Sequence, residues 1–444
     1  MSLWTAAELG AVFGVERGWD VTGISIDTRT LQPGDLFVAL AGERDGHDFV
    51  ETAFSKGAAA ALVSRPMEGN TILVDDTLKA LERLGAASRA RTGAKIVAVT
   101  GSVGKTTTKE MLRRTLSAFG AVHVAEASFN NHIGVPLTLA RMPRGVDFGV
   151  FEIGMNHPGE IAPLVALVRP HVAVVTCVDR AHLGLMGSEE AIAREKAAIY
   201  AELEPGGTAV IPGDSAFVQL LRESVPKGRQ AVVCGREARL LNVKAGAESS
   251  DIDAEIYGTP VRFTLLAPGL HMARNAIAVL AAAVALGLDA QQAAAGLDGF
   301  APFAGRGARR ELMLPRGGTI LLLDESYNAS GASMRAAFSV LALQPGRHLA
   351  VLGDMLELGD HAREEHLALL PALIQGADVI FTCGIWTRTL FDSLPPAKQG
   401  AHAPDAATLA PLVKAALVDG DTVLVKGSYG SRMRDVISHL ESPG

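Results

Sequence analysis

Short apolar runs alternate with helix-like segments along most of this chain, and the runs fall into two series. The first series begins near Lys95 and comprises residues 96–99, 146–153, 172–178 and 208–211. Helix-like segments lie between most of these runs. Such a pattern predicts a mostly parallel sheet that helices cover on both faces.

The second series lies toward the C-terminus, at residues 320–323, 349–352, 379–382 and 423–425. A segment rich in glycine and arginine, residues 300–310, separates the two series and is the expected hinge between two domains. We expect the second series to form a Rossmann-like α/β domain.

The first ninety or so residues show a smaller α/β pattern, with a short strand at 36–40 and a helix that ends at Gly57. Residues 89–93 look like a linker to the next domain. The whole pattern predicts an α/β protein in which a small N-terminal α/β domain and a C-terminal Rossmann-like domain flank a central sheet. The expected domains are residues 1–90, 91–307 and 308–444.

Length and composition agree with this division. A chain of 444 residues is too long for one ordinary core, and 48% hydrophobic with 20% charged residues is typical of globular proteins. The longest apolar stretch, 276–288, is too short to span a bilayer, and no signal peptide is evident. Cys177, Cys234 and Cys383 suit buried thiols in a reducing compartment. We therefore expect a cytoplasmic protein without a membrane partner.

The net charge of -7 argues against general nucleic-acid binding, so an anionic ligand must be held by local features. Polar residues gather where the apolar runs end. Thr100, Glu152 and residues 179–182 do so in the first series, and Asp324 and residues 426–428 in the second. Because open α/β sheets bind ligands beyond the carboxyl ends of their strands, we expect the site there.

A glycine-rich loop directly after the strand at 96–99 is the sharpest chemical signal, and it predicts a central domain of P-loop type. Its glycines let backbone N–H groups face one anion, and the following helix adds its positive end. The lysine can reach the outer phosphates of ATP, and a threonine hydroxyl can bind Mg²⁺. Only two residues precede Gly-Lys-Thr after the first glycine, where the general pattern has four. The loop consists of Gly101, Ser102, Val103, Gly104, Lys105, Thr106 and Thr107.

Three further residues could act beside this loop, although each signal is weak alone. Glu152 ends a neighbouring strand and could hold the Mg²⁺ of ATP, whereas an isolated glutamate is more often paired or on the surface. His182 lies in a loop, where histidine is usually a polar surface group. Lys196 would by default be a solvated helix residue, and it could bind a metal only as a carbamate, because a protonated amine has no lone pair.

A polar turn at residues 128–134 follows a short strand. Its amides and hydroxyl, from Ser128, Asn130 and Asn131, suit the recognition of a polar substrate. A turn that is simply held together by its asparagine side chains is an equally good interpretation of the residues alone.

Taken together, these motifs resemble the Mur ligases, which are ATP-dependent amide-forming enzymes of peptidoglycan precursor synthesis. The resemblance covers nearly the whole chain, and its segments come from all three expected domains. They are residues 27–29, 33–40, 45–49, 100–110, 130–131, 152–156, 181–183, Lys196, 269–271, Asn275, 305–306, Asp324, 327–329, 352–359, His366 and 426–428.

The resemblance implies that ATP activates a carboxylate as an acyl phosphate, which an amine then attacks. It implies two Mg²⁺ ions, one on Thr106 and Glu152 and the other on His182 and a carbamylated Lys196, with Lys105, Lys196 and His182 as catalytic residues. Besides the loop, the implied nucleotide contacts are His271, Asn275, Arg306, Asp324 and Asn328. The implied contacts of the two other substrates are Thr28, Arg29, Gly46, His47, Ser128, Asn130, Asn131 and Tyr327.

Two segments, 100–110 and 353–359, resemble the branch of the family that adds D-alanyl-D-alanine to UDP-N-acetylmuramoyl-tripeptide. These two molecules are the implied partners of a monomer that binds no nucleic acid and no membrane. Three places depart from the family's pattern and concern nucleoside contacts and a C-terminal substrate loop. They are residues 212–214, 330–331 and Tyr429.

Other readings share parts of this pattern. Within the family, a ligase that adds a different amino acid and a folate polyglutamate ligase would both share the central domain. The UDP-type segment near the N-terminus argues against the folate enzyme. A phosphotransferase or an ATP-switched binding protein would also carry the glycine-rich loop. The amine and the acceptor that together release phosphate distinguish all of these activities.

Overall fold

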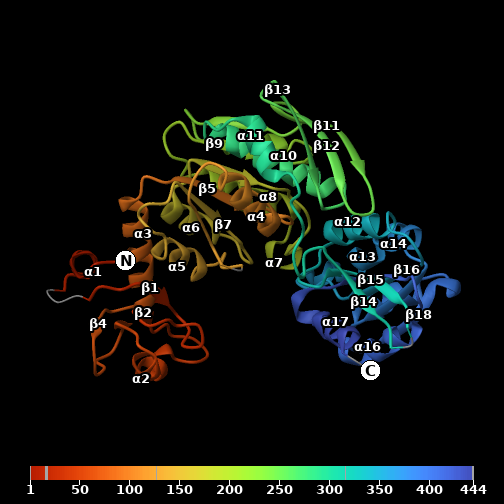
Figure 1. The fold of residues 1–444 in the computed structure, drawn as a ribbon, viewed down its shortest axis with the longest axis horizontal. Helices are drawn as coiled ribbons and strands as arrows, with labels where there is room; N and C mark the ends of the chain where they lie inside the picture. Colours follow the sequence, from red (N-terminus) through yellow and green to blue (C-terminus); the bar gives the residue numbers. More distant parts are fainter. Residues whose placement is uncertain (1, 16–18, 127, 316, 443–444) are drawn as a thin grey trace.

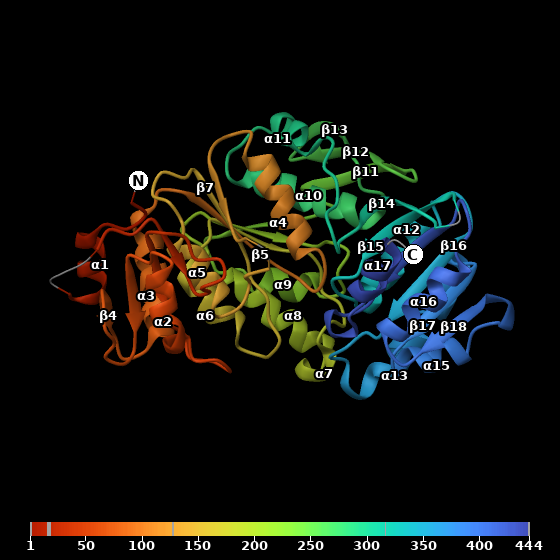
Figure 2. The same cartoon turned by 60° about the horizontal axis from the view of Figure 1, so that its bottom comes forward.

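The computed structural model describes residues 2–15, 19–126, 128–315 and 317–442, which form three α/β domains. The central domain lies between the other two, so that the chain runs from one end of the molecule to the other (Figures 1 and 2). The predicted α/β architecture, with mostly parallel sheets, is confirmed.

The N-terminal domain is a parallel sheet of four strands in the order β1-β2-β3-β4. Its strands are short, and only the one at β2 was identified from the sequence. A 3-10 helix, η1, precedes α2 within this domain. The elements are α1 (Ala6–Phe13), β1 (Gly23–Ser25), β2 (Asp35–Val38), η1 (Gly46–Phe49), α2 (Val50–Ser55), β3 (Ala60–Val63), β4 (Thr71–Leu73) and α3 (Thr77–Arg91).

The linker expected at residues 89–93 is wrong, because α3 (Thr77–Arg91) continues through most of it. The side chain of Arg89 is buried and donates to the Val168 carbonyl at 2.7 Å and to the Glu204 carboxylate at 3.0 Å. The end of α3 is therefore bonded to the central domain. A charged helix end resembles a linker in the sequence because its partners lie far along the chain.

The central domain is a parallel sheet of six strands in the order β10-β9-β8-β5-β7-β6. All four apolar runs of the first series are strands of this sheet. The strands are β5 (Lys95–Thr100), β6 (Val122–Val124), β7 (Phe148–Glu152), β8 (Val172–Val175), β9 (Thr208–Ile211) and β10 (Gln230–Val233).

Helices cover both faces of this sheet, as predicted. One apolar cluster joins the sheet to α4, α10 and α11, and a second joins it to α5, α6 and α8 (Figure 2). The helical elements are α4 (Lys105–Leu116), α5 (Gly134–Ala140), α6 (Ile161–Val168), α7 (Leu183–Met186), α8 (Glu189–Ala197), η2 (Ala198–Tyr200), α9 (Val218–Glu223), α10 (Leu270–Ala285) and α11 (Ala290–Leu297).

An antiparallel sheet of three strands was not foreseen. It consists of β11 (Ala238–Ala245), β12 (Ser250–Ile256) and β13 (Thr259–Leu265), and its buried face packs on α10. Along β12 buried residues alternate with more exposed ones, which is the period-two pattern of a sheet with one covered face.

The C-terminal domain is a six-stranded sheet in the order β14-β15-β19-β16-β17-β18, in which only the pairing of β14 with β15 is antiparallel. All four runs of the second series are strands. The strands are β14 (Ala308–Met313), β15 (Thr319–Glu325), β16 (His348–Gly353), β17 (Val379–Cys383), β18 (Gln399–Ala403) and β19 (Thr422–Lys426).

Helices again lie on both sides of this sheet, in two further apolar clusters. They are α12 (Gly331–Leu341), η3 (Gly359–His361), α13 (Ala362–Leu367), α14 (Leu370–Gly376), α15 (Trp386–Asp392), η4 (Pro396–Lys398), α16 (Ala406–Ala416), η5 (Tyr429–Ser431) and α17 (Arg434–Glu441). Throughout the described part of the chain, no helix combines the length and the apolar character needed to cross a bilayer.

Candidate active site

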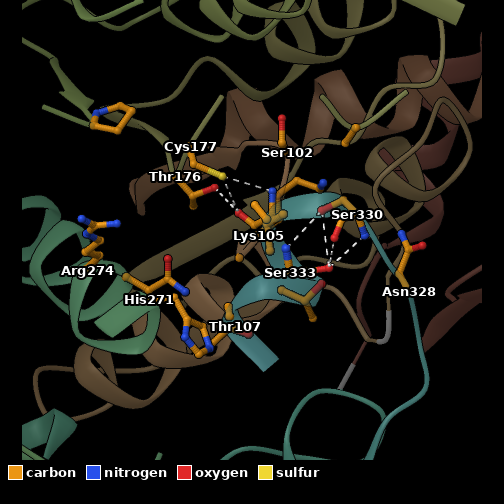
Figure 3. A pocket seen from close by; sticks show the side chains of 18 of the residues that line it. Ser102, Lys105, Thr107, Thr176, Cys177, His271, Arg274, Asn328, Ser330 and Ser333 are labelled. Carbon is orange, nitrogen blue, oxygen red and sulfur yellow. Dashed lines mark hydrogen bonds between the residues drawn. The ribbon is translucent and has the colours of Figure 1, made fainter. Parts of the chain in front are cut away.

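One large cavity lies at the C-terminal ends of the central strands, where the central domain faces the C-terminal domain (Figure 3). Its volume of about 1120 Å³ lies at the upper end of the range for ligand pockets, which leaves room for a nucleotide beside a second ligand. Most predicted site residues of these two domains line it. They are Ser102, Val103, Gly104, Lys105, Thr106, Thr107, Ser128, Asn130, Glu152, His182, His271, Asn275, Arg306, Tyr327 and Asn328.

The glycine-rich loop connects β5 to α4 in the order that the sequence predicts. Gly101 has a φ of 152° and Gly104 a φ of 87°, values that residues with side chains rarely adopt. A Cβ on Gly101 would lie 1.8 Å from the Thr176 hydroxyl, and one on Gly104 would lie 2.8 Å from the Asn275 side chain. Both glycines are therefore required, and they let the N-terminus of α4 face the cavity.

Residues just after β8 hold this loop in place, and two of them, Thr176 and Cys177, were not predicted to be part of the site. The Thr176 hydroxyl donates to the Val103 carbonyl at 2.5 Å, and the Val103 N–H donates to the Cys177 sulfur at 3.3 Å. Ser102 Oγ donates to the Asp179 carbonyl at 2.8 Å. No local motif marks these contacts, since they form only when two strands lie side by side.

Lys105 lies at the start of α4, and its Nζ donates to the Gly101 carbonyl at 2.8 Å. Burial lowers the pKa of Lys105, and the nearby positive charge of Arg306 lowers it further, against the raising effect of Glu152. Two cations thus share one partly desolvated region of the cavity. An anion bound there would stabilise both charges, as a polyphosphate does at such a loop.

Glu152 lies at the end of β7 and is only 2% exposed. Its Oε2 accepts a hydrogen bond from the Thr106 hydroxyl at 2.8 Å, and its Oε1 accepts one from the Asn130 amide at 2.7 Å. Both donors are neutral, so the negative charge is available to a cation. A carboxylate and a hydroxyl in contact are hard oxygen donors and fit Mg²⁺. Asn130, which is expected to bind substrate, also holds this carboxylate through its side-chain amide.

His182 and Lys196 lie on neighbouring elements of the central domain. His182 lines the cavity and its Nδ1 is 2.5 Å from Glu357 Oε2, which belongs to the C-terminal domain. Lys196, in α8, is 1% exposed and does not line the cavity. Burial, followed by the charge of Lys105, lowers the pKa of Lys196 to about 7. The default expectation of a solvated lysine is therefore wrong.

A group of three or more histidine, cysteine, aspartate and glutamate side chains that could hold a metal is absent from residues 2–15, 19–126, 128–315 and 317–442. This absence does not conflict with the two predicted metal sites, because neither consists of three such side chains. One site combines the Thr106 hydroxyl with Glu152, and the other combines His182 with a modified lysine.

One end of the cavity is formed by α10. His271 and Asn275 lie one helical turn apart on this helix, and both line the cavity. Burial lowers the pKa of His271, which favours a neutral ring. Figure 3 shows His271 and Arg274 on one side of Lys105. Arg274 was not predicted and pairs with Asp214 at 3.0 Å, in one of the segments that depart from the family's pattern.

The C-terminal domain forms the other wall. The Arg306 guanidinium lies 4.2 Å from the centre of the Tyr327 ring, and the Tyr327 and Tyr429 rings lie 5.9 Å apart. Lys426 Nζ donates to the Asn328 carbonyl at 2.9 Å and pairs with Glu325 at 3.2 Å. Figure 3 shows Asn328 and Ser330 on the opposite side of Lys105 from His271. The cavity therefore depends on both domains.

Asp324, which the resemblance places near the ribose, does not line the cavity. Its Oδ2 accepts a hydrogen bond from the Gly305 N–H at 3.0 Å, and its Oδ1 accepts one from the Ser326 hydroxyl at 2.7 Å. This carboxylate is buried at the junction of the two domains. The neighbouring residue, Glu325, lines the cavity instead, because successive side chains of a strand point to opposite faces.

Besides Gly101 of the glycine-rich loop, five further predicted contacts also lie outside the cavity. Thr28, Arg29, Gly46 and His47 belong to the N-terminal domain, where Arg29 is exposed and pairs with Asp27 at 2.6 Å. His47 is buried, with Nδ1 at 2.6 Å from Asp45 and Nε2 accepting from the Ser64 N–H.

Asn131 is the fifth predicted contact outside the cavity. Its Oδ1 accepts from the Gly134 N–H at 2.9 Å, so it holds the turn before α5. For Asn131 the interpretation as a turn residue is the one that fits the hydrogen bonds, whereas Ser128 and Asn130 of the same turn do line the cavity.

The central P-loop domain and the Rossmann-like domain enclose one cavity that is large enough for a nucleotide, an arrangement that fits an ATP-dependent ligase. Three family models match the sequence: "Mur ligase family, catalytic domain" at residues 20–103, "Mur ligase middle domain" at 99–283, and "Mur ligase, glutamate ligase domain" at 309–429. The chain belongs to the Mur ligase family, as the motifs predicted.

Individual relatives resemble the chain over almost its full length. A UDP-N-acetylmuramoyl-tripeptide--D-alanyl-D-alanine ligase of Synechocystis sp. is 38% identical over 95% of this chain and 92% of that protein. The crystal structure of MurF from Acinetobacter baumannii is 31% identical and covers 99% of this chain and 98% of that chain, with a TM-score of 0.89. MurF ligase from Thermotoga maritima, solved in complex with ADP, is 28% identical and covers 95% and 97%, with a TM-score of 0.79.

Proposed function

We propose that this chain uses ATP to join the amine of D-alanyl-D-alanine to the carboxylate of UDP-N-acetylmuramoyl-tripeptide in peptidoglycan precursor synthesis. The observation that carries the proposal is the cavity in which Lys105, Glu152 and His182 of the central domain face Tyr327 and Asn328 of the C-terminal domain. The names of the full-length relatives support the choice of substrates, and the ADP complex of one relative supports the nucleotide.

The reaction proceeds in two steps. The tripeptide carboxylate attacks the γ-phosphorus of ATP, the bond to ADP breaks, and an acyl phosphate forms. The dipeptide amine then attacks the acyl carbon, loses a proton and displaces inorganic phosphate. Lys105 and Arg306 offset the negative charge that builds up on the transferring phosphoryl group, which is where catalysis of this kind mainly acts.

Mg²⁺ bound at two positions would neutralise phosphate charge and hold the reacting groups in line. Thr106 and Glu152 would hold one ion, and their existing contact at 2.8 Å supports this assignment. His182 and a carbamylated Lys196 would hold the other. His271, Asn275 and Asn328 would contact the adenine.

Carbamylation of Lys196 fits its surroundings. A neutral amine adds to CO2 and releases a proton, and the lowering of the Lys196 pKa to about 7 favours the neutral amine that this reaction needs. The product carries a negative charge in place of a positive one. It would remove the repulsion from Lys105 and supply oxygen donors to a hard metal ion.

In this proposal each domain binds a different substrate. The N-terminal domain, residues 1–90, would bind the UDP group through the surface around Thr28, Arg29, Gly46 and His47. Residues 91–307 would bind ATP, and residues 308–444 would close over the amine. Because one chain encloses the whole cavity, a monomer suffices, and a reaction between ATP and a UDP-linked precursor belongs in the cytoplasm.

The test measures phosphate release with ATP and the UDP-linked tripeptide, and it compares D-alanyl-D-alanine with L-alanine, D-glutamate, L-lysine and meso-diaminopimelate. We expect fast release only with the dipeptide. Faster release with any single amino acid would overturn the proposed amine, and no release with any of them would favour the phosphotransferase or switch readings. Lys196→Ala should lose activity, with partial rescue by short-chain carboxylates if the carbamate is correct.

A further inference from the structure

One short segment of the central domain, residues 179–184, makes several polar contacts with the C-terminal domain. The Ala332 N–H donates to Asp179 Oδ2 at 3.2 Å, and the Gly184 N–H donates to the Glu357 carbonyl at 3.1 Å. His182 lies within this segment. The predicted metal ligand therefore sits on the part of the central domain that contacts the C-terminal domain.

The side chains of His182 and Glu357 meet across the domain boundary, with Nδ1 and Oε2 2.5 Å apart. The two residues have φ values of 63° and 65°, in a left-handed region that residues other than glycine seldom adopt. Two unusual backbone conformations thus bring one imidazole and one carboxylate together, and such conformations concentrate at functional positions.

This geometry has a known chemical use. A histidine that binds a metal through one ring nitrogen usually donates the N–H of the other nitrogen to a carboxylate or carbonyl, which fixes the tautomer and the orientation of the ring. With Glu357 at Nδ1, the nitrogen left for a metal is Nε2. The carboxylate comes from a different domain than the imidazole, so the ring is held in this way only when the two domains are in contact.

We propose that Glu357 is a positioning residue for His182, and that it makes metal binding at His182 and Lys196 depend on the position of the C-terminal domain. The inference rests on the proposed function, since it concerns the second metal position named there. The coupling is reciprocal: a metal ion that binds more tightly when Glu357 is in place must also strengthen the contact between the domains.

A simple interdomain ion pair would look similar, and the chain offers a matched control. Arg180 Nη1 pairs with Glu365 at 2.7 Å and so joins the same two domains without touching His182. If Glu357 acts only by holding the domains together, removing Glu365 should have the same consequence. If Glu357 acts on the imidazole, only its removal should affect the metal.

The experiment uses the full chain with a non-hydrolysable ATP analogue and titrates Mn²⁺ by electron paramagnetic resonance. We expect two Mn²⁺ ions in the unaltered protein. Glu357→Ala should weaken the second ion roughly 10–100-fold and leave the first unchanged. Glu357→Gln, which keeps an acceptor but not the charge, should lie in between, and Glu365→Ala should stay within about 3-fold of the unaltered protein.

A second readout needs no metal. The ¹⁵N chemical shifts of His182 should report a proton on Nδ1 in the unaltered protein and in Glu365→Ala, and a mixture of tautomers in Glu357→Ala. Unchanged Mn²⁺ affinity in Glu357→Ala, or equal weakening in Glu365→Ala, would overturn the proposal. If the unaltered protein bound one Mn²⁺ only, this proposal and the two-metal assignment would both fall, whereas the phosphate-release assay decides the ligase function separately.

Discussion

The central domain meets its two neighbours through junctions of different kinds. Toward the N-terminal domain the contact is a shared apolar core, in which Leu137 and Ala140 of α5 belong to the same cluster as Leu84 of α3. Backbone carbonyls complete it, since the Trp4 indole donates to Ala140 at 2.9 Å and the Arg141 side chain donates to Ile24 at 2.7 Å. We call this contact the apolar junction.

Toward the C-terminal domain the contact is mostly polar and surrounds the cavity. It comprises the pairs of His182 with Glu357 and of Arg180 with Glu365, and the hydrogen bond from the Ala332 N–H to the Asp179 carboxylate. We call it the polar junction. Buried apolar area stabilises a contact far more than exposed ion pairs do. The comparison teaches that the N-terminal domain is packed as an extension of the central one, and we expect the C-terminal domain to be the one that moves during turnover.

The largest loss of activity should come from a change inside the cavity that the polar junction surrounds. Lys105→Ala removes the cation that we propose acts on the transferring phosphoryl group, so the turnover number should fall at least about 10²–10³-fold. The melting temperature should change little, because burial already disfavours the charged form of this lysine. Single-turnover phosphate release and a thermal melt check both parts, and near-normal turnover in a folded variant would refute the loop assignment.

The next largest effect should come from the apolar junction. Leu137 is fully buried between the two domains, and Leu137→Ala should lower the free energy of unfolding by about 2–5 kcal/mol. The fraction that stays folded at 25 °C should turn over at the normal rate. Urea denaturation with activity assays on the same samples measures both quantities. If Leu137→Ala lost turnover but not stability, the apolar junction would serve catalysis as the polar junction does, and the proposed difference between the two would be wrong.

The pH dependence of the free energy of unfolding should further distinguish the apolar junction from the polar junction. His171 accepts a hydrogen bond from the Ile96 N–H at Nδ1, and burial followed by the charge of Arg89 lowers its pKa to about 4. Between pH 6.5 and 4 the unfolded histidine binds a proton that the folded one does not, so the free energy of unfolding falls as the pH falls. The loss is complete below the folded pKa and amounts to at most about 3 kcal/mol.

His171→Asn should flatten this part of the pH dependence, because the titrating ring is gone. Urea denaturation of both proteins between pH 4.5 and 7.5 provides the comparison. Parallel curves for the two proteins would mean that other groups cause the acid sensitivity near the apolar junction.

The smallest effect should come from a surface charge of the central domain beside the polar junction. Glu189 pairs with Arg180 at 2.6 Å, and both side chains are more than a third exposed. Glu189→Gln should change the free energy of unfolding by less than about 1 kcal/mol. A change as large as that of Leu137→Ala, measured in the same urea series, would show that charges rather than apolar contacts hold this junction.

Much of the fold could be predicted, because strands buried on both faces appear in a sequence as continuous apolar runs. The sheet of β11, β12 and β13 was not predicted, because one face of its strands is exposed. Apolar and polar residues alternate along such strands and do not form a continuous apolar run. Sequence reasoning named Asp324 but not Glu325, which lines the cavity, because a position at the end of a strand does not tell which of two neighbours faces the cavity. The pairing of His182 with Glu357 could not be foreseen, since it joins residues from two domains.

The polar junction contains one contact that has no side chains at all. A Cβ on Gly184 would lie 2.5 Å from the backbone nitrogen of Gly359, so the two chains touch backbone to backbone. Long side chains lose up to about 2 kcal/mol of rotamer entropy when an interface orders them, and glycine loses none. A contact between two glycines can therefore form and separate in every catalytic cycle with no loss of side-chain entropy at that point.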